Sequence, residues 1–169
     1  RKRHDKHVVP RTHGLDDGSS SVNAGCSRSF RVAMPSTRPK HEELEQVLSA
    51  ASDAPHVVLL SGHPDPDSLG SALAHQRLCE RLGLSATIAH VLPVARSENR
   101  AIVKLLNIDM IHVEEPEDLA KFGYLSLVDT NIAENLIKVP EHVKILTIVD
   151  HHRPSQVIEA PFVDIRVDV

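Results

Sequence analysis

From about residue 40 onward, short apolar runs alternate with segments whose apolar positions recur at helical spacing. The run VVLL at 57–60 is continuous, as expected of a strand that is buried on both faces. The segment EELEQVLSAA at 42–51 instead places apolar residues at i, i+3, i+4 and i+7, which predicts an amphipathic helix. The pattern predicts strands at 56–62, 85–91, 109–113, 124–130, 143–150 and 161–167, and helices or helical turns at 42–51, 68–82, 96–106, 116–122 and 132–137.

Strands that alternate with helices are typical of right-handed βαβ units and a parallel sheet. We therefore predict an α/β fold, a Rossmann-like and mostly parallel sheet of about five or six strands with helices on both faces. In such sheets, ligands bind outside the carboxyl ends of the strands. Side chains that follow the strands are thus the first place to look for chemistry.

Acidic and histidine residues follow three of the predicted strands. The strand at 109–113 ends in two glutamates and fits a peripheral position. Because parallel strands bring their carboxyl ends to one edge of the sheet, we expect the other residues to gather in one site. They are His63, Asp65 and Asp67 after the first strand, Asp129 after the fourth, and Asp150, His151 and His152 after the fifth.

Carboxylates combined with imidazoles suit Mn²⁺, Mg²⁺ or Fe²⁺, and the absence of thiolates from the set argues against structural zinc. The set exceeds what one ion needs when water and substrate also bind. Two ions about 3.5–4 Å apart, bridged by one carboxylate, would use it fully. Crowded carboxylates also repel one another without cations. The sequence therefore predicts two divalent metal ions, and Mn²⁺, Mg²⁺ and Fe²⁺ all suit this ligand set.

The prolines of HPDPD have a physical role in this prediction. Pro64 and Pro66 fix their own φ and push the preceding residues, His63 and Asp65, toward extended geometry. In an extended segment, residues i, i+2 and i+4 point the same way. We therefore expect His63, Asp65 and Asp67 to face one pocket.

The segment SLGSALA at 68–74 then begins a helix, with Asp67 or Ser68 as its N-cap. A helix N-terminus at this edge favours an anion such as phosphate. Gly70 and Ser71 in the first turn leave room for it. We therefore predict that Ser68, Gly70 and Ser71 bind substrate.

Composition narrows the possible partners. The chain has 169 residues, 41% of them hydrophobic, and a formal net charge of −4, so no global basic field attracts long nucleic acid. No apolar run approaches the roughly 18 residues of a membrane span. The two cysteines, Cys26 and Cys79, lack CxxC spacing, which favours a reduced, cytoplasmic setting. The sequence leaves the oligomeric state open, a homodimer included.

The first 38 residues differ from the rest. They are polar, rich in Arg, Ser and His, and without periodicity, which is typical of a disordered tail. A basic arm that contacts phosphate, or a non-native extension upstream of Met34, are the other interpretations. We expect the functional domain to occupy residues 39–169.

Three motifs, in order, resemble the DHH phosphoesterase family. HPDPDSLGSALA at 63–74 is similar to the first motif of the family, HxDxDxxGS. LVDTN at 127–131 is similar to the second, an Asp at a strand end, and VDHH at 149–152 to the third. Any one of them is weak alone, whereas all three on consecutive sheet elements are specific. The match covers about residues 56–169.

The resemblance implies a Mn²⁺-dependent hydrolase of phosphodiesters or phosphoanhydrides. Such enzymes include RecJ-type exonucleases, nano-RNases that also act on pAp, cyclic-dinucleotide phosphodiesterases and family II pyrophosphatases. By resemblance, the metal-binding, catalytic and orienting roles fall on specific residues. His63 and Asp65 would bind the first metal, Asp129 would bridge, Asp67 and His151 would bind the second, His152 would face the substrate, and Asp150 would orient its neighbours.

Family members usually continue into a second domain, called DHHA1, that grips the substrate, and they carry one more metal-binding Asp after the third motif. This chain ends at PFVDIRVDV, where Asp164 and Asp168 are available but differently flanked. We therefore expect the chain to be the catalytic part of a larger enzyme, and the fragment to be slow or inactive.

Blander interpretations remain for each motif. HPDPD fits a polar turn, Asp129 a helix N-cap, and DHH a turn before Pro154. Whole-chain alternatives are a pyrophosphatase, a non-catalytic nucleotide-binding module, or a plain dinucleotide-binding domain. The last needs a glycine-rich loop that SGHPDPDSLGS does not provide. The histidines and cysteine inside predicted elements are expected to be structural, namely His56, His75, His90, His112 and Cys79.

Overall fold

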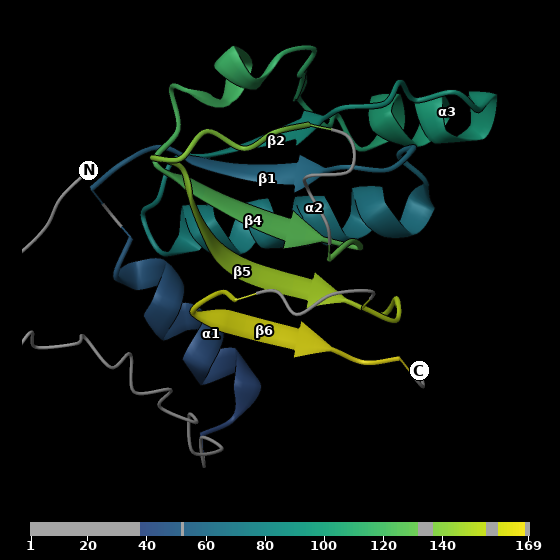
Figure 1. Cartoon of the computed structure of the whole chain (residues 1–169). Helices are drawn as coiled ribbons and strands as arrows, with labels where there is room; N and C mark the ends of the chain where they lie inside the picture. Colours follow the sequence, from purple (N-terminus) through teal and green to yellow (C-terminus); the bar gives the residue numbers. More distant parts are fainter. Residues whose placement is uncertain (1–37, 52, 132–136, 155–158, 168–169) are drawn as a thin grey trace, which may run out of the picture. The chain divides into compact units, whose positions relative to one another are not determined.

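A computed structural model describes residues 38–51, 53–131, 137–154 and 159–167, all of which belong to one compact unit. Figure 1 shows one sheet whose strands run side by side in the same direction, with helices packed against it. The α-helices are α1 (Lys40–Ser49), α2 (Pro66–Arg81) and α3 (Ser97–Leu105), and a 3-10 helix, η1, spans Pro116–Leu119. The strands are β1 (His56–Leu60), β2 (Ala86–His90), β3 (Met110–His112), β4 (Tyr124–Val128), β5 (Lys144–Asp150) and β6 (Phe162–Ile165).

The sheet has the strand order β3-β2-β1-β4-β5-β6, and every neighbouring pair is parallel. The chain starts at β1 in the middle, moves out to β3, and then returns to β4 beside β1. This reversal is the switch point at which doubly wound sheets bind ligands. The Rossmann-like parallel fold predicted from the sequence is confirmed, and β3 lies at an edge, as its glutamate-rich end indicated.

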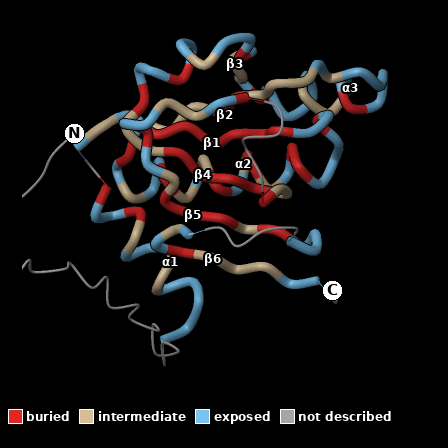
Figure 2. The backbone as a smooth tube through the Cα atoms, in the orientation of Figure 1, coloured by how far each residue is buried: buried red, intermediate tan, exposed pale blue. Residues whose placement is uncertain are grey.

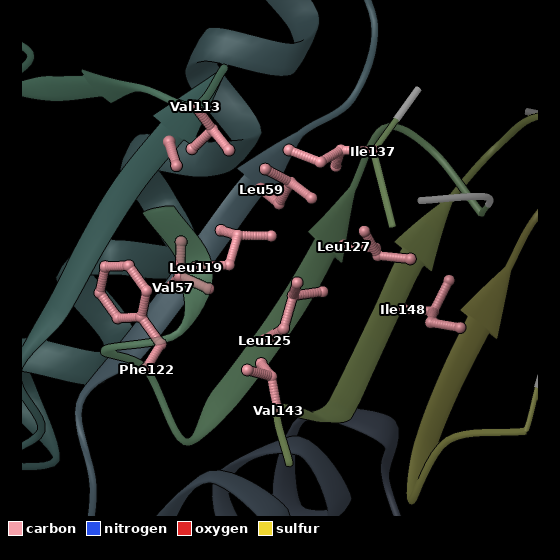
Figure 3. Close-up of a cluster of buried hydrophobic side chains, with 11 residues drawn as sticks. Val57, Leu59, Val113, Leu119, Phe122, Leu125, Leu127, Ile137, Val143 and Ile148 are labelled. Carbon is pink, nitrogen blue, oxygen red and sulfur yellow. The ribbon is translucent and has the colours of Figure 1, made fainter. Parts of the chain in front are cut away.

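Both faces of the sheet are covered. On one face, apolar side chains of β1, β2 and β4 pack against α2, with residues of α3 at the border, and α1 packs against the far end of α2. The opposite face is covered by η1 and the connections on either side of it (Figure 3). Figure 2 shows the central strands buried along most of their length. The core of this second face comprises Val57, Leu59, Ala89, Val113, Leu119, Phe122, Leu125, Leu127, Ile137, Val143 and Ile148.

Most predicted elements are observed within two residues of their predicted bounds. Gly83, predicted to stop α2, adopts a φ of 78°, which glycine adopts without strain. The predicted helix start is wrong, however. Helix α2 begins at Pro66 rather than Ser68, and its N-cap is Asp65 rather than Asp67 or Ser68. The predicted turn at 132–137, the tail before residue 38 and Asp168 lie outside the described residues, apart from Ile137.

Among the described residues, no helix is long and apolar enough to cross a membrane. The strands that the motifs follow, β1, β4 and β5, are adjacent in the sheet. Their carboxyl ends therefore meet at one edge, as Figure 1 shows for the arrowheads of these strands. The fold thus positions the three motifs as neighbours.

Candidate metal centre

Asp129 lies at the centre of this edge. It follows β4 directly and has a φ of 54°, a left-handed conformation that is uncommon for a residue other than glycine. Its backbone N–H donates to Val149 O at 2.9 Å, which fixes the turn against β5. Its side chain is only 11% exposed, and its Oδ1 is buried without a hydrogen-bond partner among the described residues. A buried carboxylate oxygen without a donor is the kind of group that a cation satisfies.

Two histidine rings and a second carboxylate surround that oxygen. His151 Nε2 lies 3.1 Å from Asp129 Oδ1, and His152 Nδ1 lies 3.8 Å from it. His151 Nε2 also lies 3.7 Å from Asp67 Oδ2. One ligand atom each from Asp129, His151 and His152 fall within 4.8 Å of one another. The structure therefore brings residues of all three motifs to one point.

Asp150 is buried beneath this group and organises the DHH turn. Its Oδ1 accepts from the backbone N–H groups of His151 at 2.8 Å and His152 at 3.1 Å. The same oxygen lies 2.8 Å from His152 Nδ1, which fixes the orientation of that ring. Asp150 thus contacts both histidines that follow it, and its orienting role in a metal site stays a prediction.

Asn131 supports the turn from the side of β4. Its Nδ2 donates to Asp150 Oδ2 and, at 3.2 Å, to the backbone oxygen of His152. The side chain is buried, so it links the second and third motifs. The sequence analysis assigned Asn131 no role. The only signal for it was its place in LVDTN, because an amide two residues after a strand-end carboxylate has many possible uses.

A hollow of about 570 Å³ opens over this site. Asp67 and Ser71 reach it from α2, and Asp164 and Arg166 reach it from the end of β6. Arg166 pairs with Asp164 at 2.9 Å and places an exposed guanidinium on the hollow. Its complete lining is Asp67, Ser71, Asp129, Val149, Asp150, His151, Asp164 and Arg166.

Asp65 caps helix α2 instead of lying on an extended segment that continues to Asp67. Its Oδ1 accepts from Asp67 N at 3.1 Å and Ser68 N at 2.9 Å, and Asp65 N donates to Ser68 Oγ at 2.8 Å. The expectation that His63, Asp65 and Asp67 share one direction is therefore wrong, because the helix begins between Asp65 and Asp67. The backbone N–H groups predicted to hold phosphate donate their hydrogen bonds to the Asp65 side chain. The Ser68 hydroxyl accepts from the Asp65 backbone N–H, which completes a capping box at the start of α2.

His63 lies apart from the four gathered groups. Its Nδ1 is 3.3 Å from Pro93 O, and its ring lines a second hollow of about 260 Å³. Arg96 and Asn99 line this second hollow from the α3 side, and Asn99 Nδ2 donates to Pro64 O at 2.8 Å. Asp65 lines it as well. In this conformation His63 and Asp65 border the neighbouring space, whereas Asp67, Asp129 and His151 border the first one.

The electrostatics of the site are those of crowded carboxylates. Burial raises the pKa of Asp129, and the charges of Asp65 and Asp67 raise it further, while the His152 and His151 rings oppose the shift. The hydrogen bond to Asp150 raises the pKa of His152, with the charges of Asp150, Asp129 and Asp65 adding to it against partial burial. Burial first, and the neighbouring carboxylates second, thus disfavour the ionised form of Asp129.

The donor set fits divalent cations. Asp67, Asp129 and His151 supply carboxylate oxygens and an imidazole nitrogen, the ligands that Mn²⁺ and related ions accept. Asp129 Oδ1, which accepts no hydrogen bond although His151 Nε2 lies 3.1 Å away, is the atom that gains most from a cation.

Comparison with known proteins agrees with the motif pattern. The family model described as "DHH family, N-terminal domain" matches residues 57–168. An uncharacterized protein of Methanocaldococcus jannaschii is 34% identical over 117 residues. That match covers 69% of this chain and 23% of the relative, so the chain spans about a quarter of the relative's length.

Proposed function

This chain belongs to the DHH family of phosphoesterases. From that premise we propose that it hydrolyses phosphodiester bonds with the help of two divalent cations, of which Mn²⁺ is the preferred ion. The observation that carries the proposal is the buried Asp129 Oδ1 without a hydrogen bond, set between His151 and His152. A buried carboxylate oxygen in a structural turn normally accepts a hydrogen bond. A cation at this position would satisfy the oxygen and would offset the charge of Asp67 at the same time.

The residues divide the work by position. Asp129, Asp67 and His151 would hold the cations, with His63 and Asp65 completing the set. When bound, the two cations lower the pKa of a water, orient it for in-line attack and offset charge on the phosphoryl oxygens. His152 directs Nδ1 to Asp150, which leaves Nε2 for the substrate. The hydrogen bond to Asp150 raises the pKa of His152, which favours a charged ring that would donate a hydrogen bond to a phosphate oxygen.

Substrate contacts would come from the first hollow. Ser71 lies on α2 and Arg166 at the end of β6, and both line it. Gly70 is exposed in the second turn of α2, and a Cβ there would meet no atom within 4 Å apart from its chain neighbours and the backbone of its own helix, which leaves room for an approaching phosphate. The net charge of −4 favours small substrates over long duplex DNA. We rank short oligonucleotides, cyclic dinucleotides and pAp first, and pyrophosphate next.

A product panel tests the proposal. The chain and the full-length Methanocaldococcus jannaschii relative are each incubated with a dinucleotide, a cyclic dinucleotide, pAp and pyrophosphate, with Mn²⁺ or with EDTA. We expect Mn²⁺-dependent cleavage of a phosphodiester, faster in the longer protein. If pyrophosphate were the one substrate of the four to be cleaved, the protein would be a pyrophosphatase and not a phosphodiesterase. Ligand protection against unfolding without turnover by either protein would contradict the enzyme and favour a binding module.

Asn131 offers a separate test of how the DHH turn is held. Asn131→Ala removes the donor that fixes Asp150 and the His152 carbonyl. Loss of a partner that orients metal ligands typically weakens metal binding about 10–100-fold. We expect that loss in a Mn²⁺ titration followed by electron paramagnetic resonance of the free ion. Unchanged affinity in a folded variant would show that Asp150 holds the turn without Asn131.

A further inference from the structure

A second cluster of ligating side chains lies at the opposite end of β1 from the DHH site. His56 is the first residue of β1, and His75 and Cys79 lie on α2. Their relative exposures are 1%, 5% and 0%. One ligand atom from each of the three falls within 4.8 Å of the others. The cluster thus joins the central strand to the helix that covers it, inside the core.

One ring nitrogen of each histidine in this cluster lacks a hydrogen-bond partner among the described residues. His56 Nδ1 and His75 Nε2 are buried without a hydrogen bond to any described residue. A buried polar atom left unsatisfied typically costs about 1–3 kcal/mol. Two such atoms on separate elements, in a cluster that also contains the Cys79 thiol, are not explained by packing alone. One shared partner with affinity for nitrogen and sulfur would satisfy both.

The spacing of the three residues suits a metal ligand set. His75 and Cys79 are four residues apart on α2, so their side chains lie on the same face of the helix. His56 approaches from the strand below, and its ring centroid is 6.1 Å from that of His75. Imidazole and thiolate together select zinc-like ions over Mg²⁺ or Ca²⁺. This donor chemistry differs from the carboxylate-rich DHH site.

The other nitrogen of His56 already has the partner that a metal-bound imidazole requires. His56 Nε2 lies 2.7 Å from Ser126 Oγ, which in turn accepts from Thr147 Oγ1 at 2.6 Å. An Nε2–H that donates to Ser126 leaves Nδ1 as a bare lone pair, the form that binds a cation. Metal-binding histidines are held by such bonds on the opposite nitrogen. The hydrogen bonds between His56 and Ser126 on β4, and between Ser126 and Thr147 on β5, therefore orient the His56 ring.

We propose that His56, His75 and Cys79 supply three of the four ligands of a Zn²⁺ site that ties β1 to α2, with a water in the fourth position. Both imidazoles bind through neutral nitrogens, and the Cys79 thiol loses its proton to solvent as the S–Zn bond forms. The site would stabilise the fold without taking part in hydrolysis. Burial lowers the pKa of both histidines to about 4, so both are neutral at physiological pH. Burial raises the pKa of Cys79 to about 11, so the thiolate forms only with the cation.

Cobalt provides a specific probe, because a thiolate bound to Co²⁺ absorbs in the near ultraviolet and carboxylates do not. The Cys26→Ser variant (C26S), in which Cys79 is the one remaining thiol, is refolded with Co²⁺. We expect the thiolate band in C26S, its loss in C26S/C79S, and its retention in C26S/D129N. Zn²⁺ added during refolding should abolish the band and raise the unfolding temperature of C26S.

The outcomes separate the two sites. Absence of the band from folded C26S refolded with Co²⁺ would overturn the proposal, whatever the DHH site binds. If C26S/C79S fails to fold, C26S/H75N takes its place, and a band that persists at full strength there would also overturn it. Loss of the band in H75N with native circular dichroism would support it. Loss of the band in folded C26S/D129N would show that the thiolate site depends on the DHH site and would contradict the proposal of an independent structural site.

Discussion

Asp129→Asn is expected to abolish Mn²⁺-dependent hydrolysis and to weaken Mn²⁺ binding by more than about 100-fold. Residues that only orient metal ligands are worth about 10–100-fold, and Asp129 is a ligand at the centre of the set. The substitution keeps the volume of the side chain and the backbone turn, since asparagine also tolerates positive φ. Isothermal titration with Mn²⁺ and turnover of the best substrate measure the two losses.

The same substitution should stabilise the metal-free fold, which makes the prediction two-sided. The folded pKa of Asp129 is raised by burial and by Asp65 and Asp67. A raised carboxyl pKa contributes stability below the unfolded pKa, and that contribution is lost as the pH rises through the folded pKa. At pH 7 the ionised carboxylate therefore destabilises the fold. In EDTA, D129N should resist urea better than the parent chain, and in excess Mn²⁺ the order should reverse.

Asp109→Asn is the matched control, because Asp109 is an exposed residue that precedes β3 at the edge of the sheet. It should change neither Mn²⁺ binding nor the order of stability. Retained turnover in D129N would contradict the two-metal assignment. If D129N were less stable than the parent chain in EDTA, Asp129 would be a structural group, and its unpartnered oxygen would need another explanation.

The sequence was sufficient for the sheet and for the edge that carries the chemistry. Parallel strands buried on both faces leave continuous apolar runs such as VVLL, and the right-handed crossover rule then limits the topology. The meeting of Asp129 with the DHH turn follows from that topology alone. Strand ends are set by backbone pairing, so residues that follow them are placed without knowledge of any side-chain contact.

The HPDPD segment was harder to predict because two local rules apply there at once. Pro64 and Pro66 favour extended residues before them, and Pro66 is also a favoured first residue of a helix. Both rules hold: Asp65 is extended, with φ −119° and ψ 178°, and it caps the helix that begins at Pro66, so Asp67 lies on the helix and not on an extended segment. The direction of His63 depends on Pro93, thirty residues away, and no local pattern contains that information.

Acidification is expected to destabilise the metal-free chain strongly, through His56 and His75 rather than through surface groups. Burial lowers the pKa of each from 6.5 to about 4. Between these values the unfolded chain binds protons that the folded chain excludes. The free energy of unfolding therefore falls as the pH drops from about 6.5 to about 4, and this contribution changes no further below that range.

The size of the effect is large relative to ordinary stability. A shift from 6.5 to about 4 is about 2.5 units, which corresponds to about 3 kcal/mol for each ring at 1.36 kcal/mol per unit. The charges of the two rings also repel, so the pair acts jointly rather than as two independent groups. The total free energy of unfolding of a typical domain is about 5–15 kcal/mol. Loss of several kcal/mol should bring the midpoint of acid unfolding close to pH 4–5.

Replacement of one ring tests this account. His75→Leu keeps an apolar side chain of similar size between α2 and the sheet, and it removes one of the two titrating groups. Urea unfolding in EDTA at pH 7 and at pH 4.5 should show roughly half of the parent's loss of stability. His41→Gln, at an exposed position on α1, should retain the whole loss. If H75L lost as much unfolding free energy between pH 7 and pH 4.5 as the parent chain does, the acid sensitivity would arise from other groups. Removal of a buried neutral histidine must reduce the part of the pH dependence that this histidine causes.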